Sequence, residues 1–206
     1  MAISTYTELK ASIAGFLNRD DLTATIPDFI ALAESSINRD VRHWRMEKRT
    51  TLAISSQYTA LPTDWLEAGR LTVQGDGTSE LELVSLSELA DMRAWGADST
   101  GRPAYYAING SDIEVSPSPD SAYTVDLIYT ARTAALSDTN ETNWLLTYAP
   151  DVYLYASLIH TAPYLAEDER ASTWAAFYKS SAAALNKDSR KAKVGGSGMR
   201  MKVKSY

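Results

Sequence analysis

The spacing of the apolar residues changes twice along this 206-residue chain, and these changes constrain its fold more than any other feature. Near both ends the apolar residues recur every three or four positions, which is the spacing of one face of a helix. Between about residues 46 and 142 they alternate with polar residues, as in half-buried strands. The order of helices, strands and helices predicts an α+β fold.

Two helices are predicted before the strands. Thr5 and Glu8 have the spacing of a capping box, and the apolar stripe that follows predicts a helix over residues 5–19. Pro27 suits the first turn of a second helix, whose stripe predicts that it extends to Trp44.

The middle of the chain is predicted to be rich in antiparallel strands. The Asn109-Gly110 pair is typical of a tight hairpin turn, and Ser85 with Glu88 indicates one short helix within this region. Strands are predicted over residues 51–54, 57–61, 69–73, 80–86, 104–108, 112–115 and 123–129.

Helical spacing returns at Pro150. The helix over residues 150–164 is apolar on more than one side, so it needs several neighbours, and an Ala-rich helix follows and ends near Lys193. We therefore expect a four-helix bundle of two N-terminal and two C-terminal helices, with an inserted antiparallel β-rich lobe and an extended C-terminal arm. The predicted domains are residues 1–45 with 143–193 for the bundle, 46–142 for the lobe and 194–206 for the arm.

The C-terminal arm is basic although the chain has a net charge of -6. Residues 187–206 contain seven Lys/Arg and one Asp, which leaves thirteen Lys/Arg and twenty-five Asp/Glu in residues 1–186. After the glycines at 195, 196 and 198, residues 199–204 alternate apolar and basic side chains, as in a strand that adds to a partner. The alternative is a solvated tail.

Catalytic and metal-binding residues are not predicted. The chain has no cysteine and only two histidines, His43 and His160, which are expected to be surface or packing residues. It has no HExxH, G-x-S-x-G or P-loop motif. We therefore predict no enzyme activity and no cofactor.

The composition also bears on the partners. No apolar run approaches the ~20 residues that span a bilayer, and the N-terminal segment MAISTYTELK lacks a secretory pattern, so no membrane association is expected. The twelve Tyr and five Trp indicate either a protein interface or a Tyr-rich core. A cytoplasmic small-ligand or nucleic-acid-binding protein with a basic tail is the alternative function, but the acidic body and the lack of rings in the arm before Tyr206 disfavour nucleic acid.

A series of short segments then identifies a family. The segments are YTALPTDWL (58–66), RLTV (70–73), PAYYAINGSDI (103–113), SPSPD (116–120), YTVDLIY (123–129), LS (136–137), NWL (143–145) and YAPDVYLYA (148–156). In this order and between helices, they resemble tailed-phage head–tail adaptor proteins, which are also called connector or tail tubular A proteins in short-tailed phages. The resemblance spans about residues 5–193.

The resemblance implies a structural protein of the virion without catalytic activity. Such adaptors form a ring, usually of twelve copies, beneath the portal protein. The ring joins the portal to the tail nozzle or tail tube protein and continues the DNA channel without specific DNA binding. The expected location is the head–tail junction of the virion, after synthesis in the cytoplasm of the bacterial host.

The resemblance also implies a portal-binding region, because terminal extensions in this family reach the portal, and the loops of the β lobe are our candidates for the contact with the tail. The candidate portal-binding residues are Lys191, Lys193, Met199, Arg200, Met201, Lys202, Val203, Lys204 and Tyr206. The candidate tail-contact residues, in two loops of the β lobe, are Gly75, Asp76, Gly77, Asp98 and Arg102.

Overall fold

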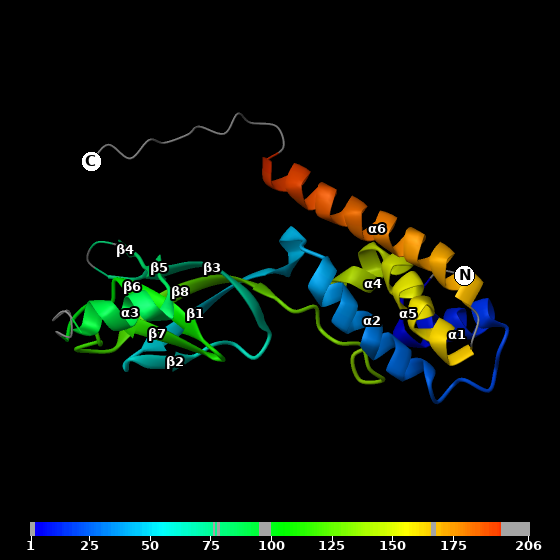
Figure 1. Ribbon diagram of the computed structural model, residues 1–206, viewed down its shortest axis with the longest axis horizontal. Helices are drawn as coiled ribbons and strands as arrows, with labels where there is room; N and C mark the ends of the chain where they lie inside the picture. Colours follow the sequence, from blue (N-terminus) through cyan, green and yellow to red (C-terminus); the bar gives the residue numbers. More distant parts are fainter. Residues whose placement is uncertain (1–2, 76, 78, 95–99, 166–167, 195–206) are drawn as a thin grey trace. The chain divides into compact units, whose positions relative to one another are not determined.

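The computed structural model describes residues 3–75, 77, 79–94, 100–165 and 168–194 (Figure 1). These residues form an α+β structure with six α-helices and two four-stranded, mainly antiparallel sheets. The chain divides into two compact units, residues 1–46 with 133–206 and residues 47–132. We call them the helical unit and the β unit.

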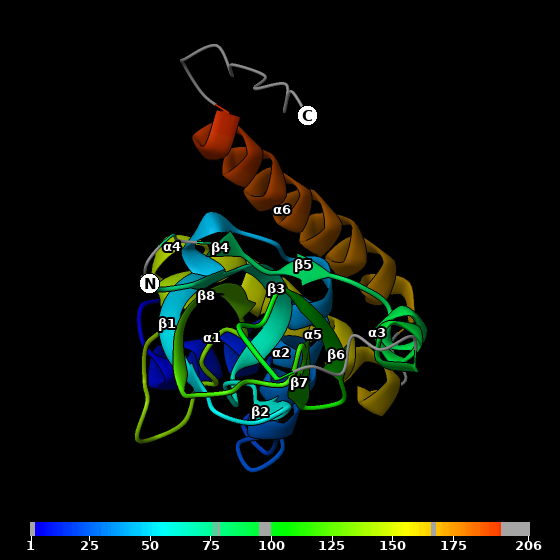
Figure 2. The ribbon, with the colours of Figure 1, turned by 90° about the vertical axis from the view of Figure 1, so that its left-hand side faces the viewer.

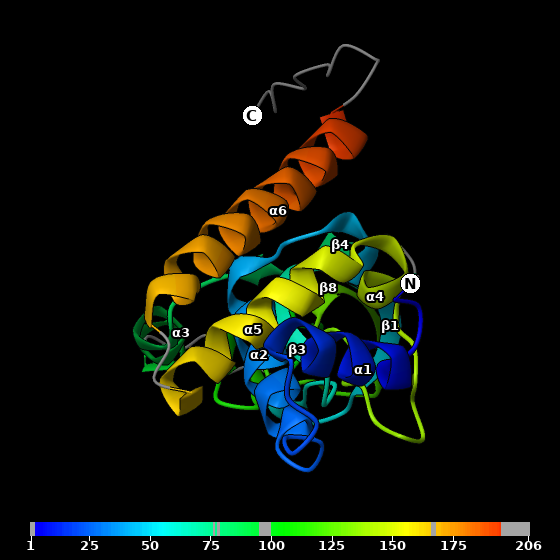
Figure 3. The ribbon, with the colours of Figure 1, turned by 90° about the vertical axis from the view of Figure 1, so that its right-hand side faces the viewer.

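The helical unit is built around α5, which packs against α1, α2, α4 and α6. Figures 1 and 3 show α5 between α6 on one side and α1 and α2 on the other. Most α5 side chains from Val152 to Leu158 are buried, which confirms the prediction that this helix is covered on several sides. The elements are α1 (Tyr6–Leu17), α2 (Ile26–Asp40), the 3-10 helix η1 (Trp44–Met46), α4 (Trp144–Tyr148), α5 (Pro150–Leu165) and α6 (Asp168–Val194).

The start of α1 confirms the predicted capping box. The Glu8 N–H donates to Thr5 Oγ1 at 3.2 Å, and the Thr5 N–H donates to a Glu8 carboxylate oxygen at 3.1 Å. Two N–H groups that the first turn of a helix leaves unpaired are thereby satisfied. Asn18, with φ of 52°, ends the helix.

The predicted end of α2 at Trp44 is wrong, because the helix ends at Asp40 and Val41 is extended. The Arg42 N–H donates to Asn186 Oδ1 of α6 at 2.8 Å, where a continuing helix would donate to its own carbonyl. A contact between distant segments therefore ends this helix, and the local apolar pattern does not contain that information.

The short helix α4 was not predicted from the sequence. Its first turn is capped by Asn143, whose Oδ1 accepts the Leu146 N–H at 2.9 Å, and its Leu145 and Leu146 are buried. Five residues are too few for a periodic pattern to indicate a helix.

Residues 133–142 group with the helices in the structure, whereas the sequence-based boundaries place them in the β lobe. Two side chains of α2 bind this segment: Asn38 Oδ1 accepts the Thr133 N–H at 3.0 Å, and Glu34 Oε1 accepts the Leu136 N–H at 2.7 Å.

The β unit contains two sheets and one short helix (Figure 2). The strand orders are β1-β8-β3-β4 and β2-β7-β6-β5, and among the described strands only β5 and β6 pair in parallel. Apolar side chains of both sheets form one core, which includes Ile54, Leu71, Ile113, Val115, Val125 and Leu127. The elements are β1 (Glu47–Ile54), β2 (Tyr58–Ala60), β3 (Trp65–Val73), β4 (Ser79–Glu80), β5 (Glu82–Leu83), α3 (Leu86–Met92), β6 (Tyr105–Asn109), β7 (Asp112–Ser116) and β8 (Tyr123–Ala131).

The predicted hairpin is confirmed as β6 and β7. They pair antiparallel with Asn109 opposite Asp112, so the two turn residues are Gly110, with φ of +63°, and Ser111. The predicted turn at Asn109 and Gly110 is therefore wrong by one residue, because Asn109 still pairs within β6. The strand that follows, β8, lies in the other sheet between β1 and β3. Gly69 of β3 lies at an irregularity opposite Ile128, where a Cβ would be 2.8 Å from the Ile128 carbonyl oxygen.

The chain enters and leaves the β unit on neighbouring strands. Glu47 at the start of β1 pairs with Thr130 near the end of β8. The two connections to the helical unit are therefore adjacent at the edge of this unit.

Candidate partner-binding surface

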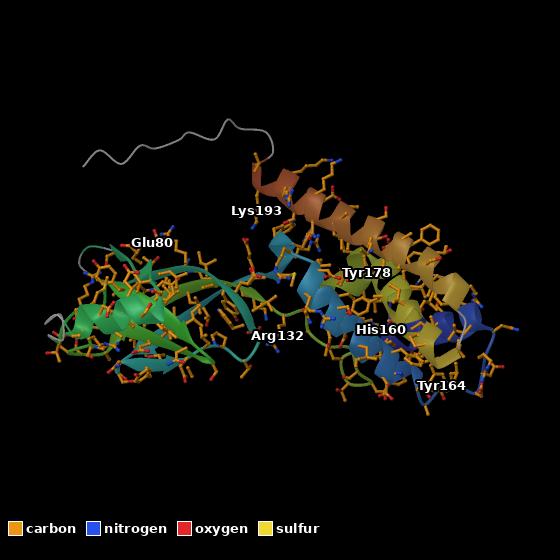
Figure 4. The ribbon with its side chains drawn as sticks, viewed as in Figure 1. Glu80, Arg132, His160, Tyr164, Tyr178 and Lys193 are labelled. Atoms are coloured by element: carbon orange, nitrogen blue, oxygen red, sulfur yellow. The ribbon has the colours of Figure 1, made fainter. Side chains whose placement is uncertain are left out.

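The predicted portal-binding residues fall partly within the described structure. Lys191 and Lys193 are exposed on the last turn of α6 (Figure 4). The other candidates lie outside the described residues: Met199, Arg200, Met201, Lys202, Val203, Lys204 and Tyr206.

Three exposed side chains of the helical unit form what we call the aromatic–arginine patch: Trp44, Arg45 and Tyr148. The Arg45 guanidinium carbon lies 5.2 Å from the centroid of the Trp44 ring and 4.7 Å from that of the Tyr148 ring. Trp44 is 43% exposed and Tyr148 is 47% exposed. Trp, Tyr and Arg are the residues that most often dominate binding energy at protein interfaces.

His43 packs against the buried side of this patch, and its side chain is only 3% exposed. Its ring stacks on Trp144 at 5.1 Å and lies 5.5 Å from Trp44 and 5.7 Å from Tyr148. The Arg45 N–H donates to His43 Nδ1 at 3.3 Å, which favours the neutral ring with its proton on Nε2. Burial, together with the positive charge of Arg45, lowers the pKa of His43. His43 is thus a packing residue, as expected from the sequence.

The C-terminal part of α6 holds the chain segment that carries Trp44. The Trp44 N–H donates to Ser189 Oγ at 2.9 Å, and Asn186 binds both the Arg42 N–H at 2.8 Å and the Asp40 carbonyl at 3.0 Å. The patch and the basic end of α6 are therefore fixed next to each other.

The end of α6 is strongly cationic. Its last residues include Lys187, Arg190, Lys191 and Lys193, against one carboxylate, Asp188. Cations near the C-terminus of a helix also interact favourably with its dipole. With Arg45, these residues make the surface suited to an acidic partner.

The predicted tail-contact residues lie in the β unit, and the structure brings three of the five together. Arg102 Nη2 donates to the Gly77 carbonyl at 2.5 Å, and Gly75 and Gly77 adopt φ of +124° and +76° in the same turn. The other two candidates, Asp76 and Asp98, lie outside the described residues.

An ion pair with a buried carboxylate, which the sequence did not reveal, holds the chain between α3 and Arg102 against β7. Arg93, directly after α3, pairs with Glu114 of β7 and also donates to the Val115 carbonyl at 2.9 Å. Gln57 and Tyr58 donate to the same Glu114 oxygen at 3.2 and 3.3 Å. These hydrogen bonds hold the pKa of Glu114 below its ordinary value although burial would raise it.

Across the described residues, no group of three or more acidic or histidine side chains is placed to hold a metal ion. No helix among them has both the length and the apolar composition that a membrane crossing requires.

Comparison with protein families gives a match to the model described as SU10 adaptor protein, over residues 4–201. A search of curated proteins gives no match. The matched segment includes both units and nearly the whole chain.

Proposed function

Because the chain belongs to the SU10 adaptor protein family, a family of phage head–tail adaptors, we propose that it forms a ring that joins the portal protein to the tail. In this role the protein is a structural component of the virion at the head–tail junction. It is made in the host cytoplasm, needs no cofactor or membrane, and catalyses no reaction.

The observation that carries the portal-side assignment is the aromatic–arginine patch beside the basic end of α6. Exposed Trp44 and Tyr148 supply apolar contact area, and Arg45, Lys191 and Lys193 supply positive charge. The arm follows directly after Val194 and adds Arg200, Lys202 and Lys204. In the proposal, this combined surface binds an acidic surface of the portal.

The rest of the assignment follows from the family and the charge distribution. We infer that α1, α2, α5 and α6 act as the four-helix bundle that forms the ring, with twelve copies as the expected number.

Outside the basic C-terminal segment the chain carries a large excess of acidic residues. Acidic walls let DNA pass through the channel without binding it. The turn at Gly75 and Gly77, with Arg102, is the proposed contact with the tail nozzle or tail tube.

Deletion of residues 195–206 tests the portal assignment. The truncated subunit should keep its helical circular dichroism, because α6 ends at Val194. It should bind portal rings at least tenfold more weakly and leave capsids without tails. Electron microscopy of mixtures with portal rings, together with a titration, measures both effects.

Two full-length variants make this experiment sharper. Replacing both Trp44 and Arg45 by alanine should also weaken portal binding, whereas Lys179→Ala, exposed elsewhere on α6, should not. If the truncated chain and the Trp44/Arg45 variant both bind portals as well as the wild type, the portal-side assignment is wrong. Binding to free DNA that falls steeply with salt would instead favour the nucleic-acid-binding alternative.

A further inference from the structure

One side of α5 faces α6 and leaves a partly open groove. Ser181 Oγ donates to Asp151 at 2.5 Å, and the rings of Tyr155 and Phe177 lie 5.1 Å apart. Phe177 nevertheless remains 49% exposed.

The opposite side of α5 faces α2. His160 Nε2 lies 3.2 Å from Ser36 Oγ, and the Tyr164 ring lies 5.7 Å from that of Phe29 (Figure 4). His160 and Tyr164 each follow a residue on the α6 side of α5, Asp151 or Tyr155, by nine positions. Nine residues at about 100° each amount to two and a half turns, so the two pairs point in opposite directions from α5.

The groove lies between α4, α5 and α6 and has a volume of about 340 Å³. Small side chains of α6 make its wall shallow, and two carboxylates, Asp151 and Asp188, give it negative charge. Lys191 forms an exposed ion pair with Asp188 at 4.0 Å, and Tyr148 at one end of the groove also belongs to the aromatic–arginine patch. No basic side chain is among its described lining residues, which are Tyr148, Ala149, Asp151, Ser180, Ser181, Ala184, Leu185 and Asp188.

The outer face of α2 forms a ridge with the complementary properties. Leu32 is 51% exposed, and Arg39, seven residues and about two turns further on, is also exposed. Tyr164 of α5, 59% exposed, extends this apolar surface. The ridge therefore presents one exposed aliphatic side chain, one ring and one positive charge.

We propose that the groove of one subunit binds the α2 ridge of a second copy of this chain. Leu32 packs against the exposed Phe177 and the small wall around Ala184, and Arg39 pairs with Asp188. The two surfaces differ and face opposite ways, so the contact is heterologous, and a ring forms when the rotation between neighbouring copies closes. This inference rests on the proposed adaptor ring and names the surfaces that form it.

Cysteine crosslinking tests this contact directly, because the chain has no cysteine of its own. The variant with Leu32→Cys and Ala184→Cys, assembled on portal rings and treated with a short bismaleimide, should give a ladder of covalent oligomers. Each single variant should stay monomeric on a denaturing gel. The matched control combines Leu32→Cys with Ala183→Cys, which is exposed on α6 but points about 100° away, and should crosslink much less.

The outcomes separate this inference from the adaptor assignment. A ring on the portal without a ladder, or dimers from a single-cysteine variant, overturns the proposed contact and leaves the adaptor role standing. Failure of the wild-type chain to bind portals at all overturns the adaptor role and this inference with it.

Charge reversal provides a second test that does not depend on crosslinking. Arg39→Glu should weaken ring assembly about tenfold, and adding Asp188→Arg should restore most of it, because the pair is re-formed with opposite signs. Circular dichroism and thermal melting verify that each variant is folded. No recovery in the folded double variant would contradict the Arg39–Asp188 pairing.

Discussion

Individual polar residues stabilise this structure where they connect segments that are distant in the sequence. Asn186 and Ser189 bind the chain around Trp44, Glu34 and Asn38 bind the segment after β8, and Arg93 binds Glu114 in the β unit. Most of these side chains pair with a backbone N–H group, and Arg93 supplies the charged partner of the buried Glu114. Such groups are costly when left unpaired.

Arg93→Met should destabilise the β unit by about 3 kcal/mol at neutral pH, because the buried Glu114 carboxylate loses its charged partner and keeps only Gln57 and Tyr58. In the wild type the pKa of Glu114 lies below 4.5, so its contribution to stability is present above pH 4.5 and is lost as the pH falls through the folded pKa. In the variant, burial should raise this pKa. The loss of stability should therefore be larger at pH 7 than at pH 4 in urea unfolding.

The matched control for this prediction is Arg49→Met, which removes the exposed partner of Asp126. Because Gln74 still binds Asp126 and the Arg49 side chain is 68% exposed, this change should cost less than about 1 kcal/mol. Equal losses in the two variants would show that the Arg93–Glu114 pair has no special role.

At the scale of elements, the long helix α6 is stabilised on one face and at its end. Its buried stripe, with Trp174, Tyr178, Ala182 and Leu185, packs into the helical unit. Near its C-terminus, Asn186 and Ser189 hold the helix by hydrogen bonds to the backbone of residues 40–44. The proposed portal-binding surface depends on these bonds, because they join its two parts.

Asn186→Ala should loosen the end of α6 from residues 40–44 and destabilise the helical unit by about 1–3 kcal/mol, since two backbone groups lose their partner. Hydrogen exchange should become faster at Arg42 and in the last turns of α6. The neighbouring exposed Lys187→Ala should change stability by less than about 0.5 kcal/mol. Unchanged exchange in the Asn186 variant would refute this account of the helix end.

How much could be predicted from the sequence depended on whether the cause was local. The capping box at Thr5 and Glu8 and the hairpin around Gly110 involve neighbouring residues and were confirmed, although the two turn residues are Gly110 and Ser111 and not Asn109 and Gly110. The end of α2 was wrong because it depends on Asn186, 144 residues away from Arg42. The position of β8 between two distant strands is likewise set by pairing that no local pattern contains.

The candidate binding surface, too, could be predicted only where its residues are neighbours in the sequence. Its basic residues Lys191 and Lys193 were found from composition, whereas the meeting of Trp44, Arg45 and Tyr148 requires η1 and α4 to come together. The excess of Tyr and Trp was the only signal, and it did not say which rings gather.

For the whole molecule, the decisive feature is that one unit is inserted into the other through adjacent strands. Glu47 and Thr130 are paired residues, so their Cα atoms lie only about 5 Å apart. The β unit has its own core from both sheets. Its ends therefore need no support from the helices.

Residues 47–132 expressed alone should fold, with a β-type circular dichroism spectrum and a single cooperative unfolding transition. The helical unit, with these residues replaced by a short Gly-Ser linker, should keep its helical signal. Both follow because the connection points are adjacent and each unit forms its own contacts. A β unit that is unfolded in isolation would show that it depends on the helices for stability.

The adjacent connections also determine how the β unit responds to mechanical force. A pull that draws Met46 away from Arg132 acts on the end of the β1–β8 ladder, where Glu47 and Thr130 pair. The backbone hydrogen bonds between β1 and β8 would then break one at a time, starting at Glu47 and Thr130. Breaking them singly requires far less force than breaking all of them together. A subunit pulled in this way would yield first at the joint between its two units.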